Sequence, residues 1–184
     1  MPWILITHEA YSDNDLCSLP TGTLTFSNIQ FDVRGLIRLD AVTNSSLNGA
    51  IAISYPSAVR DIQIGAKCRR IHVLHGAEDS VPDGIVICRY VVRYADGSQH
   101  EIPVLYGRDV RNWWELDNDV NPQSDHGIVA WRGTNPAVAD RGGHLRLYLS
   151  SFENPQPDVR VTTLELVSAE TRAAPFLIAL TIEP

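Results

Sequence analysis

The sequence predicts an all-β fold, an antiparallel two-sheet β-sandwich of jelly-roll type, and three observations support this. Residues 85–94 alternate, so that Cys88 and Tyr90 share one face of an extended chain while Arg89 and Val91 share the other. No long segment repeats apolar residues at the i, i+3, i+4 and i+7 spacing of an amphipathic helix. Short apolar runs are instead separated by Gly, Pro, Asn and Asp at intervals of roughly ten residues, as in a sandwich of short strands.

Three strands are predicted around this alternating segment, at residues 70–75, 85–94 and 101–106. Asp96-Gly97 separates the second from the third and is typical of a tight hairpin, because glycine adopts a positive φ without strain. Pro103 has no N–H to donate to a neighbouring strand, so the third strand is expected at a sheet edge or with its proline unpaired. The three strands are expected to form one antiparallel meander, which needs a second layer to cover its apolar face.

The other elements follow in chain order. Residues 3–7 are an apolar start that fits an edge strand, and residues 11–23 are predicted as a loop. Further strands are predicted at residues 23–33 (one bent strand or two short ones), 35–39, 50–55, 59–64, 128–131, 145–150, 159–167 and 176–182. Loops are predicted at residues 109–127 and 135–143, and the first is long enough to suggest a function or a structure of its own.

Length and composition predict one domain, residues 1–184, whose hydrophobic core is large enough to be stable without disulfide bonds or structural metal ions. The net charge of −7 argues against a nucleic-acid-binding or anionic-membrane-binding surface, because each needs a concentrated basic face. No apolar run approaches the roughly 18 residues of a membrane span. The expected location is cytoplasmic, or secreted if a signal peptide has been removed. Cys17, Cys68 and Cys88 are expected to be reduced, with a Cys68–Cys88 disulfide as the alternative.

The order of several motifs resembles the galactose-binding-like β-sandwich modules that accompany bacterial glycoside hydrolases. The resemblance covers roughly residues 24–183, and the segments that carry it are Leu74-His75, YVVRYADG (90–97), Ile102-Pro103-Val104, YGRD (106–109), Trp113-Trp114, Ala130-Trp131, LRLY (145–148) and ENPQPD (153–158). It implies a two-sheet jelly roll, a non-catalytic role, sugar binding through the loops at one end, and frequently a structural calcium ion.

The loop at residues 109–127 holds the predicted ligand site. Sugar rings pack their C–H faces on indole rings, while Asp, Asn and Arg side chains bind the hydroxyl groups. This chemistry and the resemblance select as ligand-binding residues Arg108, Asp109, Trp113, Trp114, Asn154 and Asp158. The alternative is that one or both tryptophans plug the end of the sandwich and anchor the loop.

An acidic run in the same loop is the candidate metal site. Its oxygen-bearing residues are Asp117, Asp119, Asn121 and Asp125. The spacing resembles the first ligands of an EF-hand, but Pro122 stands where that loop needs glycine, and Ile128 stands where it needs glutamate. The alternatives are a calcium site of another geometry, with Asp117, Asp119 and Asp125 as ligands, and a solvated acidic loop.

The sequence carries no complete catalytic constellation, so the protein is predicted not to be an enzyme. His72 and His75 are three residues apart, which places them on opposite faces of a strand rather than together as metal ligands. The chain has no GxSxG motif and no glycine-rich phosphate loop. Two functions remain: a non-catalytic carbohydrate-binding module that uses the loop with Trp113 and Trp114, or a structural or protein-interaction β-sandwich, with a protein partner or as a homo-oligomer, without a small ligand.

Overall fold

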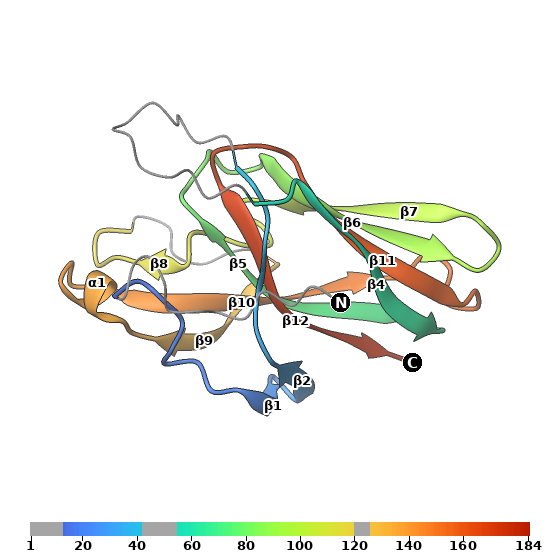
Figure 1. Cartoon of the computed structure of the whole chain (residues 1–184), viewed down its shortest axis with the longest axis horizontal. Helices are drawn as coiled ribbons and strands as arrows, with labels where there is room; N and C mark the ends of the chain where they lie inside the picture. Colours follow the sequence, from blue (N-terminus) through green and yellow to red (C-terminus); the bar gives the residue numbers. More distant parts are fainter. Residues whose placement is uncertain (1–12, 42–54, 120–125) are drawn as a thin grey trace.

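The computed structural model describes residues 13–41, 55–119 and 126–184 and has an all-β fold with antiparallel strand pairing (Figure 1). Within these ranges the elements are β1 (Gly22–Phe26), β2 (Ile29–Val33), β3 (Ile37–Arg38), β4 (Ala58–Ala66), β5 (Arg70–Glu78), β6 (Val86–Tyr94), β7 (Gln99–Leu105), β8 (Trp114–Glu115), β9 (Ile128–Gly133), α1 (Pro136–Ala139), β10 (His144–Glu153), β11 (Val161–Ser168) and β12 (Ala174–Glu183). No helix in the described part is long and apolar enough to cross a membrane.

The strands of the described ranges form two sheets and a separate hairpin. The small sheet has the strand order β4-β11-β6-β7, and the large sheet has the order β3-β12-β5-β10-β8, with β9 also paired to β10. Strands β1 and β2 form a separate hairpin, with Ser27 and Asn28 in the left-handed conformation at its turn. Residues 23–33 are therefore two short strands. Strand β7 lies at the edge of the small sheet, as Pro103 predicted.

The predicted meander is wrong in one respect. Strand β6 pairs with β7 through the hairpin at Gly97, but β5 pairs with β10 and β12 in the opposite sheet. Residues 79–85 therefore cross from one sheet to the other. Alternation in a sequence indicates which side chains share a face, but it does not indicate which strand is the hydrogen-bonded neighbour.

The inner core fills the space between the two sheets. Strands β5 and β6 contribute alternate residues, such as Ile71 and Val73 from the large sheet and Tyr90 and Val92 from the small sheet. His75 also faces this layer, where its Nδ1 lies 3.3 Å from the hydroxyl oxygen of Tyr90. His72 faces the opposite side of the same strand and contacts Ser151, so the predicted separation of the two histidines is confirmed.

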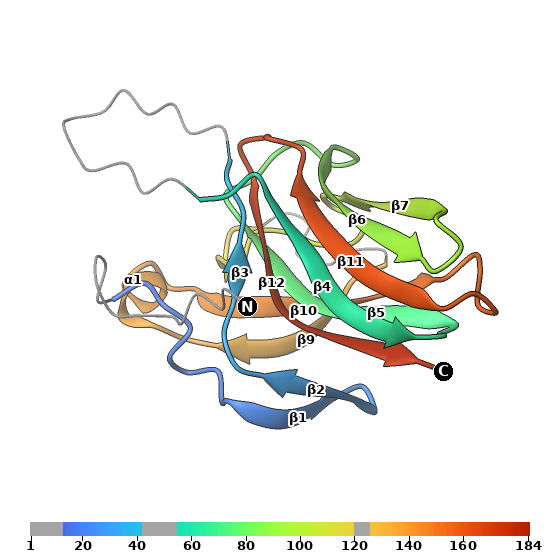
Figure 2. The same ribbon diagram turned by 45° about the vertical axis from the view of Figure 1, so that its right-hand side comes forward.

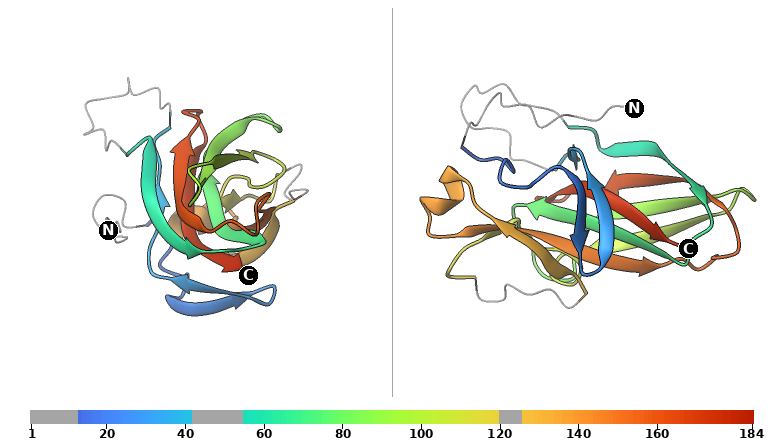
Figure 3. Two further views of the ribbon diagram at one scale, coloured as in Figure 1. Left: turned by 90° about the vertical axis from the view of Figure 1, so that its right-hand side faces the viewer. Right: turned by 90° about the horizontal axis from the view of Figure 1, so that it is seen from below.

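A second, outer core covers the other face of the large sheet. Figures 2 and 3 show the β1–β2 hairpin lying across this face, on the side away from the small sheet. The buried side chains of the outer core come from the hairpin and the segment before it, the large sheet, the stretch before β8 and helix α1: Leu16, Leu19, Phe31, Val33, Leu74, Trp113, Val138, Leu145, Leu147, Leu149, Phe176, Ile178 and Ala179. Both faces of β5 and β10 are therefore buried along most of their length, and the buried residues include polar ones such as His75 and Arg146.

Gly76 permits the close packing of the outer core. It lies opposite Phe176 on the adjacent strand, and a Cβ at this position would lie 2.3 Å from Cζ of the Phe176 ring. We expect Gly76→Ala to lower the free energy of unfolding by about 2 kcal/mol, the usual cost of overpacking a core. Urea unfolding followed by circular dichroism measures this change. In a Phe176→Leu background the same substitution should cost less, and an equal cost in both backgrounds would exclude the ring as the cause.

Other local predictions have clear outcomes. Residues 135–143 are not wholly loop, because Asn135 accepts a hydrogen bond from Val138 N and caps the one-turn helix α1. None of the three cysteines, all within the described ranges, forms a disulfide; Cys68 and Cys88 are buried and Cys17 is exposed. The strand predicted at residues 3–7 and most of the one predicted at 50–55 lie outside the described residues.

Candidate functional site

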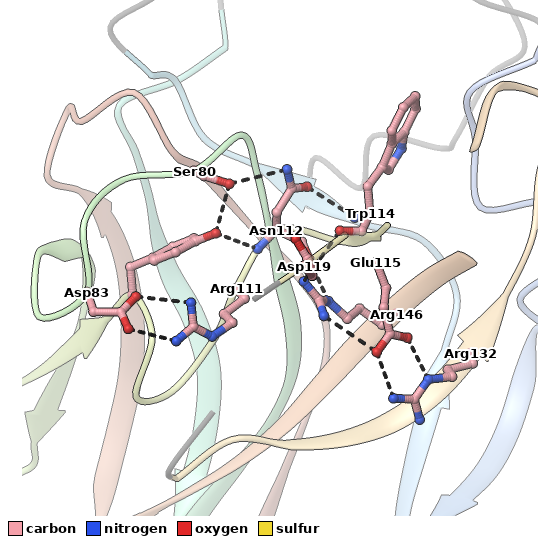
Figure 4. Close-up of polar contacts among 10 residues, drawn as sticks. Ser80, Asp83, Arg111, Asn112, Trp114, Glu115, Asp119, Arg132 and Arg146 are labelled. Carbon is pink, nitrogen blue, oxygen red and sulfur yellow. Dashed lines mark hydrogen bonds and ion pairs between the residues drawn. The ribbon is translucent and has the colours of Figure 1, made fainter. Parts of the chain in front are cut away.

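A polar pocket lies at one end of the sandwich, where residues 79–85 and the stretch after β7 meet β10. It has a volume of about 320 Å³ and is lined by Ser80, Val81, Asp83, Tyr106, Arg111, Asn112, Asp119 and Arg146. We call it the end pocket (Figure 4). Seven of these eight side chains carry hydrogen-bonding groups, so the lining of the end pocket is mostly polar.

Arg111 forms one wall of the end pocket and is held from two sides. Its two terminal nitrogens donate to the two carboxylate oxygens of Asp83 over 3.0 and 2.8 Å, a bidentate pair. Its guanidinium carbon lies 5.7 Å from the centroid of the Tyr106 ring. The Asp83 carboxylate occupies space that a side chain at position 107 would fill, since a Cβ on Gly107 would lie 2.5 Å from Cγ of Asp83. Gly107 also has a φ of +87°, which other residues adopt with strain.

Arg146 projects from the start of β10 into the end pocket, with only 2% of its side chain exposed. Its Nε donates to the carbonyl of Asn112 over 2.9 Å, and its Nη2 donates to Asp119 over 2.8 Å. A longer ion pair joins it to Glu115, whose carboxylate also accepts two hydrogen bonds from Arg132. The hydrogen bonds from Arg132, with the positive charge of Arg146, hold the pKa of Glu115 below its ordinary value despite partial burial.

Three uncharged groups complete the end pocket. The Tyr106 hydroxyl donates to Ser80 Oγ over 2.9 Å and accepts from the backbone N–H of Asn112 over 3.1 Å. The Asn112 side chain accepts from Trp114 N and reaches Ser80 with its amide nitrogen over 3.5 Å. Two arginines and two aspartates line the same pocket, so the charges of its wall balance.

The tryptophan pair lies beside the end pocket rather than in it. Trp113 is 8% exposed and packs edge-on against Phe176 in the outer core, with ring centroids 6.0 Å apart. The indole of Trp114 points away from the arginines in Figure 4 and donates through Nε1 to Asn14 over 3.2 Å. Trp113 thus anchors the loop, the alternative that the sequence left open for the pair.

Asp109 is also a structural residue. Its side chain is fully buried, its Oδ2 accepts from Leu105 N over 2.8 Å, and Arg108 donates to both of its oxygens. These contacts close the tight turn after β7 and hold in place the stretch that carries Arg111. Arg108 is half-exposed beside this turn and is not one of the residues that line the end pocket.

Asn154 and Asp158 lie at the other end of the sandwich. Leu145 of β10 pairs with Trp114, whereas Glu153, eight positions later, pairs with Arg70. At about 3.3 Å per residue the two places are roughly 26 Å apart along the strand. Asn154 is buried and binds the Tyr94 hydroxyl and the carbonyl of Cys68, while Asp158 is exposed. The structure therefore does not bring these two residues together with the tryptophan loop.

The candidate calcium ligands Asp117 and Asp119 have different surroundings. Asp119 binds Arg146 over 2.8 Å, and Asp117 is exposed two residues earlier. Asp125, like Asn121, lies outside the described residues. Within residues 13–41, 55–119 and 126–184, no group of three or more His, Cys, Asp or Glu side chains is placed to hold a metal ion. A calcium site in this loop stays a prediction.

A Ser-His-Glu arrangement lies on the outer face of the large sheet. Ser151 Oγ is 2.7 Å from Nδ1 of His72, and Glu183 is 3.4 Å from its Nε2. In serine hydrolases the serine contacts Nε2 and the acid contacts Nδ1, so the order here is reversed. Cross-strand pairing of Ser151 with His72 accounts for the contact without a catalytic role.

Of the residues selected from the sequence, Asp119 lines the end pocket, whereas most of its other lining side chains were not selected. Arg111 and Asn112 lie between Asp109 and Trp113, which were selected, and Asp83 lies between two predicted strands. The signal for Arg146 was present in residues 145–150, where it shares a strand face with Tyr148, because a charged residue on a buried face needs a partner.

Comparison with known proteins adds no assignment to this geometry: no protein-family model matches the chain, and no curated protein matches its sequence.

Proposed function

We propose that this protein is a non-catalytic binding module for carbohydrate and that the end pocket is its ligand site. Part of the proposal is that the sandwich is a jelly roll of the galactose-binding-like kind. The observation that supports it is the set of side chains in the end pocket, where arginine, aspartate, asparagine and serine groups converge at one end of a rigid β scaffold. Polar side chains of these types bind the hydroxyl groups of sugars.

Preorganisation supports the same proposal. Arg146 is held by several partners, Arg111 by its ion pair with Asp83 and by the Tyr106 ring, and Asn112 by its contacts to Tyr106 and Trp114. Side chains that are already ordered lose little conformational entropy when a ligand binds, so their hydrogen bonds contribute more to affinity. A rigid polar pocket of this kind is suited to a small ligand rather than to an extended protein surface.

A structural or protein-interaction sandwich is the second candidate, and the burial of Trp113 favours it. A sugar platform needs an indole face open to solvent, and Trp113 does not offer one. In this case the protein acts through a partner protein or as a homo-oligomer, and the end pocket has no ligand.

We expect Asn112→Ala to weaken sugar binding about fivefold, the effect of losing one hydrogen bond to a neutral group. A glycan array followed by calorimetric titration of the sugars that bind, with calcium or with chelator, measures this change. Trp114→Ala is the matched control, because the indole lies next to the end pocket but points away from it. If sugar binding is lost in Trp114→Ala but kept in Asn112→Ala, the ligand site is at the indole and not in the end pocket. If no sugar of a broad panel binds, the second candidate function is favoured.

A further inference from the structure

We propose that the end pocket selects an acidic sugar, and that the ligand carboxylate binds Arg111 in the place now held by Asp83. This inference rests on the proposed function, because it names the class of carbohydrate. Asp83 would act as an internal substitute that keeps the buried guanidinium paired until a ligand arrives.

The two partners of this ion pair differ in how firmly they are held. Only 10% of the Arg111 side chain is exposed, whereas 57% of the Asp83 side chain is exposed on a connection between the sheets. Arg111 also rests over the Tyr106 ring. The guanidinium is therefore the fixed member, and the carboxylate can turn into solvent with little loss of burial.

The geometry of the pair is the one that a ligand carboxylate needs. Asp83 meets Arg111 through two parallel hydrogen bonds, the preferred arrangement between guanidinium and carboxylate groups. The space above Gly107, which has no Cβ, accommodates the Asp83 carboxylate. The buried Nε of Arg111 has no hydrogen-bond partner among the described residues, so this guanidinium is incompletely satisfied by Asp83 alone.

The lining of the end pocket favours an acidic sugar over a neutral one. Neutral sugars gain much of their affinity by packing C–H faces on an open aromatic ring. Among the described lining residues the one aromatic ring is that of Tyr106, which is 4% exposed and lies beneath Arg111. Recognition here must come from charge and hydrogen bonds, and a carboxylate supplies both.

The effect of Asp83→Asn on uronate affinity distinguishes two roles of Asp83, a competitor of the ligand carboxylate and an acceptor for sugar hydroxyl groups. If Asp83 competes with the ligand, its replacement should tighten the binding of glucuronate or galacturonate about tenfold, the effect of one charge-assisted hydrogen bond. If Asp83 is an acceptor for sugar hydroxyls, the same change should weaken binding. Asp79→Asn is the matched control, because Asp79 carries the same charge in the same connection, pairs with Arg172 and does not line the end pocket.

The experiment is calorimetric titration of the whole protein and its variants with glucuronate, galacturonate, glucose, galactose and acetate. We expect tighter uronate binding in Asp83→Asn, no change in Asp79→Asn, and loss of uronate binding in Arg111→Lys, which keeps the charge but not the two-pronged geometry. Urea unfolding of each variant checks that the fold is intact.

Three results would overturn the inference. Unchanged or weaker uronate binding in Asp83→Asn would show that Asp83 is not a competitor. Equal binding of glucose and glucuronate would leave the proposed function standing and remove the acidic preference. Acetate that binds Asp83→Asn as tightly as glucuronate would show a carboxylate site without sugar recognition, which would also count against the proposed function.

Discussion

Arg146→Met is expected to lower the free energy of unfolding by about 3 kcal/mol, the cost of removing one member of a buried charged network. The guanidinium is almost fully buried and holds together Asp119, Glu115 and the carbonyl of Asn112. Without it these acceptors lose a donor, and the two carboxylates lose a positive charge between them. Urea unfolding at neutral pH, followed by tryptophan fluorescence, measures the change.

Arg146→Lys is the matched control for this prediction. Lysine keeps the charge but cannot reproduce the planar set of donors, so about half of the stability loss is expected. Apolar residues sometimes replace a whole buried ion pair without cost, but Arg146→Met leaves both acidic partners in place. A stable Arg146→Met protein would therefore contradict this prediction.

Acidification is expected to destabilise the protein through His75. Burial in the inner core lowers the pKa of His75 to about 4, although the charge and carbonyl of Asp109 oppose this shift. The unfolded chain takes up a proton at this residue near its ordinary pKa of about 6.5, while the folded protein does not. The contribution of neutral His75 to the free energy of unfolding is therefore fully present above about pH 6.5. It is lost as the pH falls to about 4, and the loss is about 3 kcal/mol in total.

The hydrogen bonds around His75 explain why the neutral form is retained. Ser150 Oγ donates to the carbonyl of Asp109, so it accepts from Nε2–H of His75, and Nδ1 then accepts from the hydroxyl of Tyr90. If Nδ1 of His75 were also protonated, its N–H would point at the hydroxyl hydrogen of Tyr90 and this hydrogen bond would be lost. This network joins β5, β6 and β10 to the turn that carries Arg108 and Asp109.

His75→Gln tests this assignment, because glutamine can donate and accept but does not titrate. The pH dependence of unfolding in urea should be less steep in the variant than in the wild type between pH 6.5 and 4. Acidic residues contribute equally to both proteins, so the difference between the two slopes isolates His75. Equal slopes would mean that another group carries the dependence.

Local features of the fold were predictable because they depend on neighbouring residues. Pro103 at an edge strand, the turn at Asp96-Gly97 and the opposite faces of His72 and His75 follow from backbone chemistry and the period-two geometry of a strand. The pairing of β5 with β10 and β12 was not predictable in this way, because its partners lie far away in the sequence and many apolar strands would fit equally well.

The same distinction applies to the site. By itself the sequence determined an all-β chain, the positions of most strands and the loop in which Arg111 lies. Only the tertiary structure decided that Trp113 enters the outer core, that Asn154 lies at the far end, and that Asp83 meets Arg111 across 28 positions. The reason is that a β-sandwich places its connections by long-range pairing, so the residues of one pocket come from segments that share no local pattern.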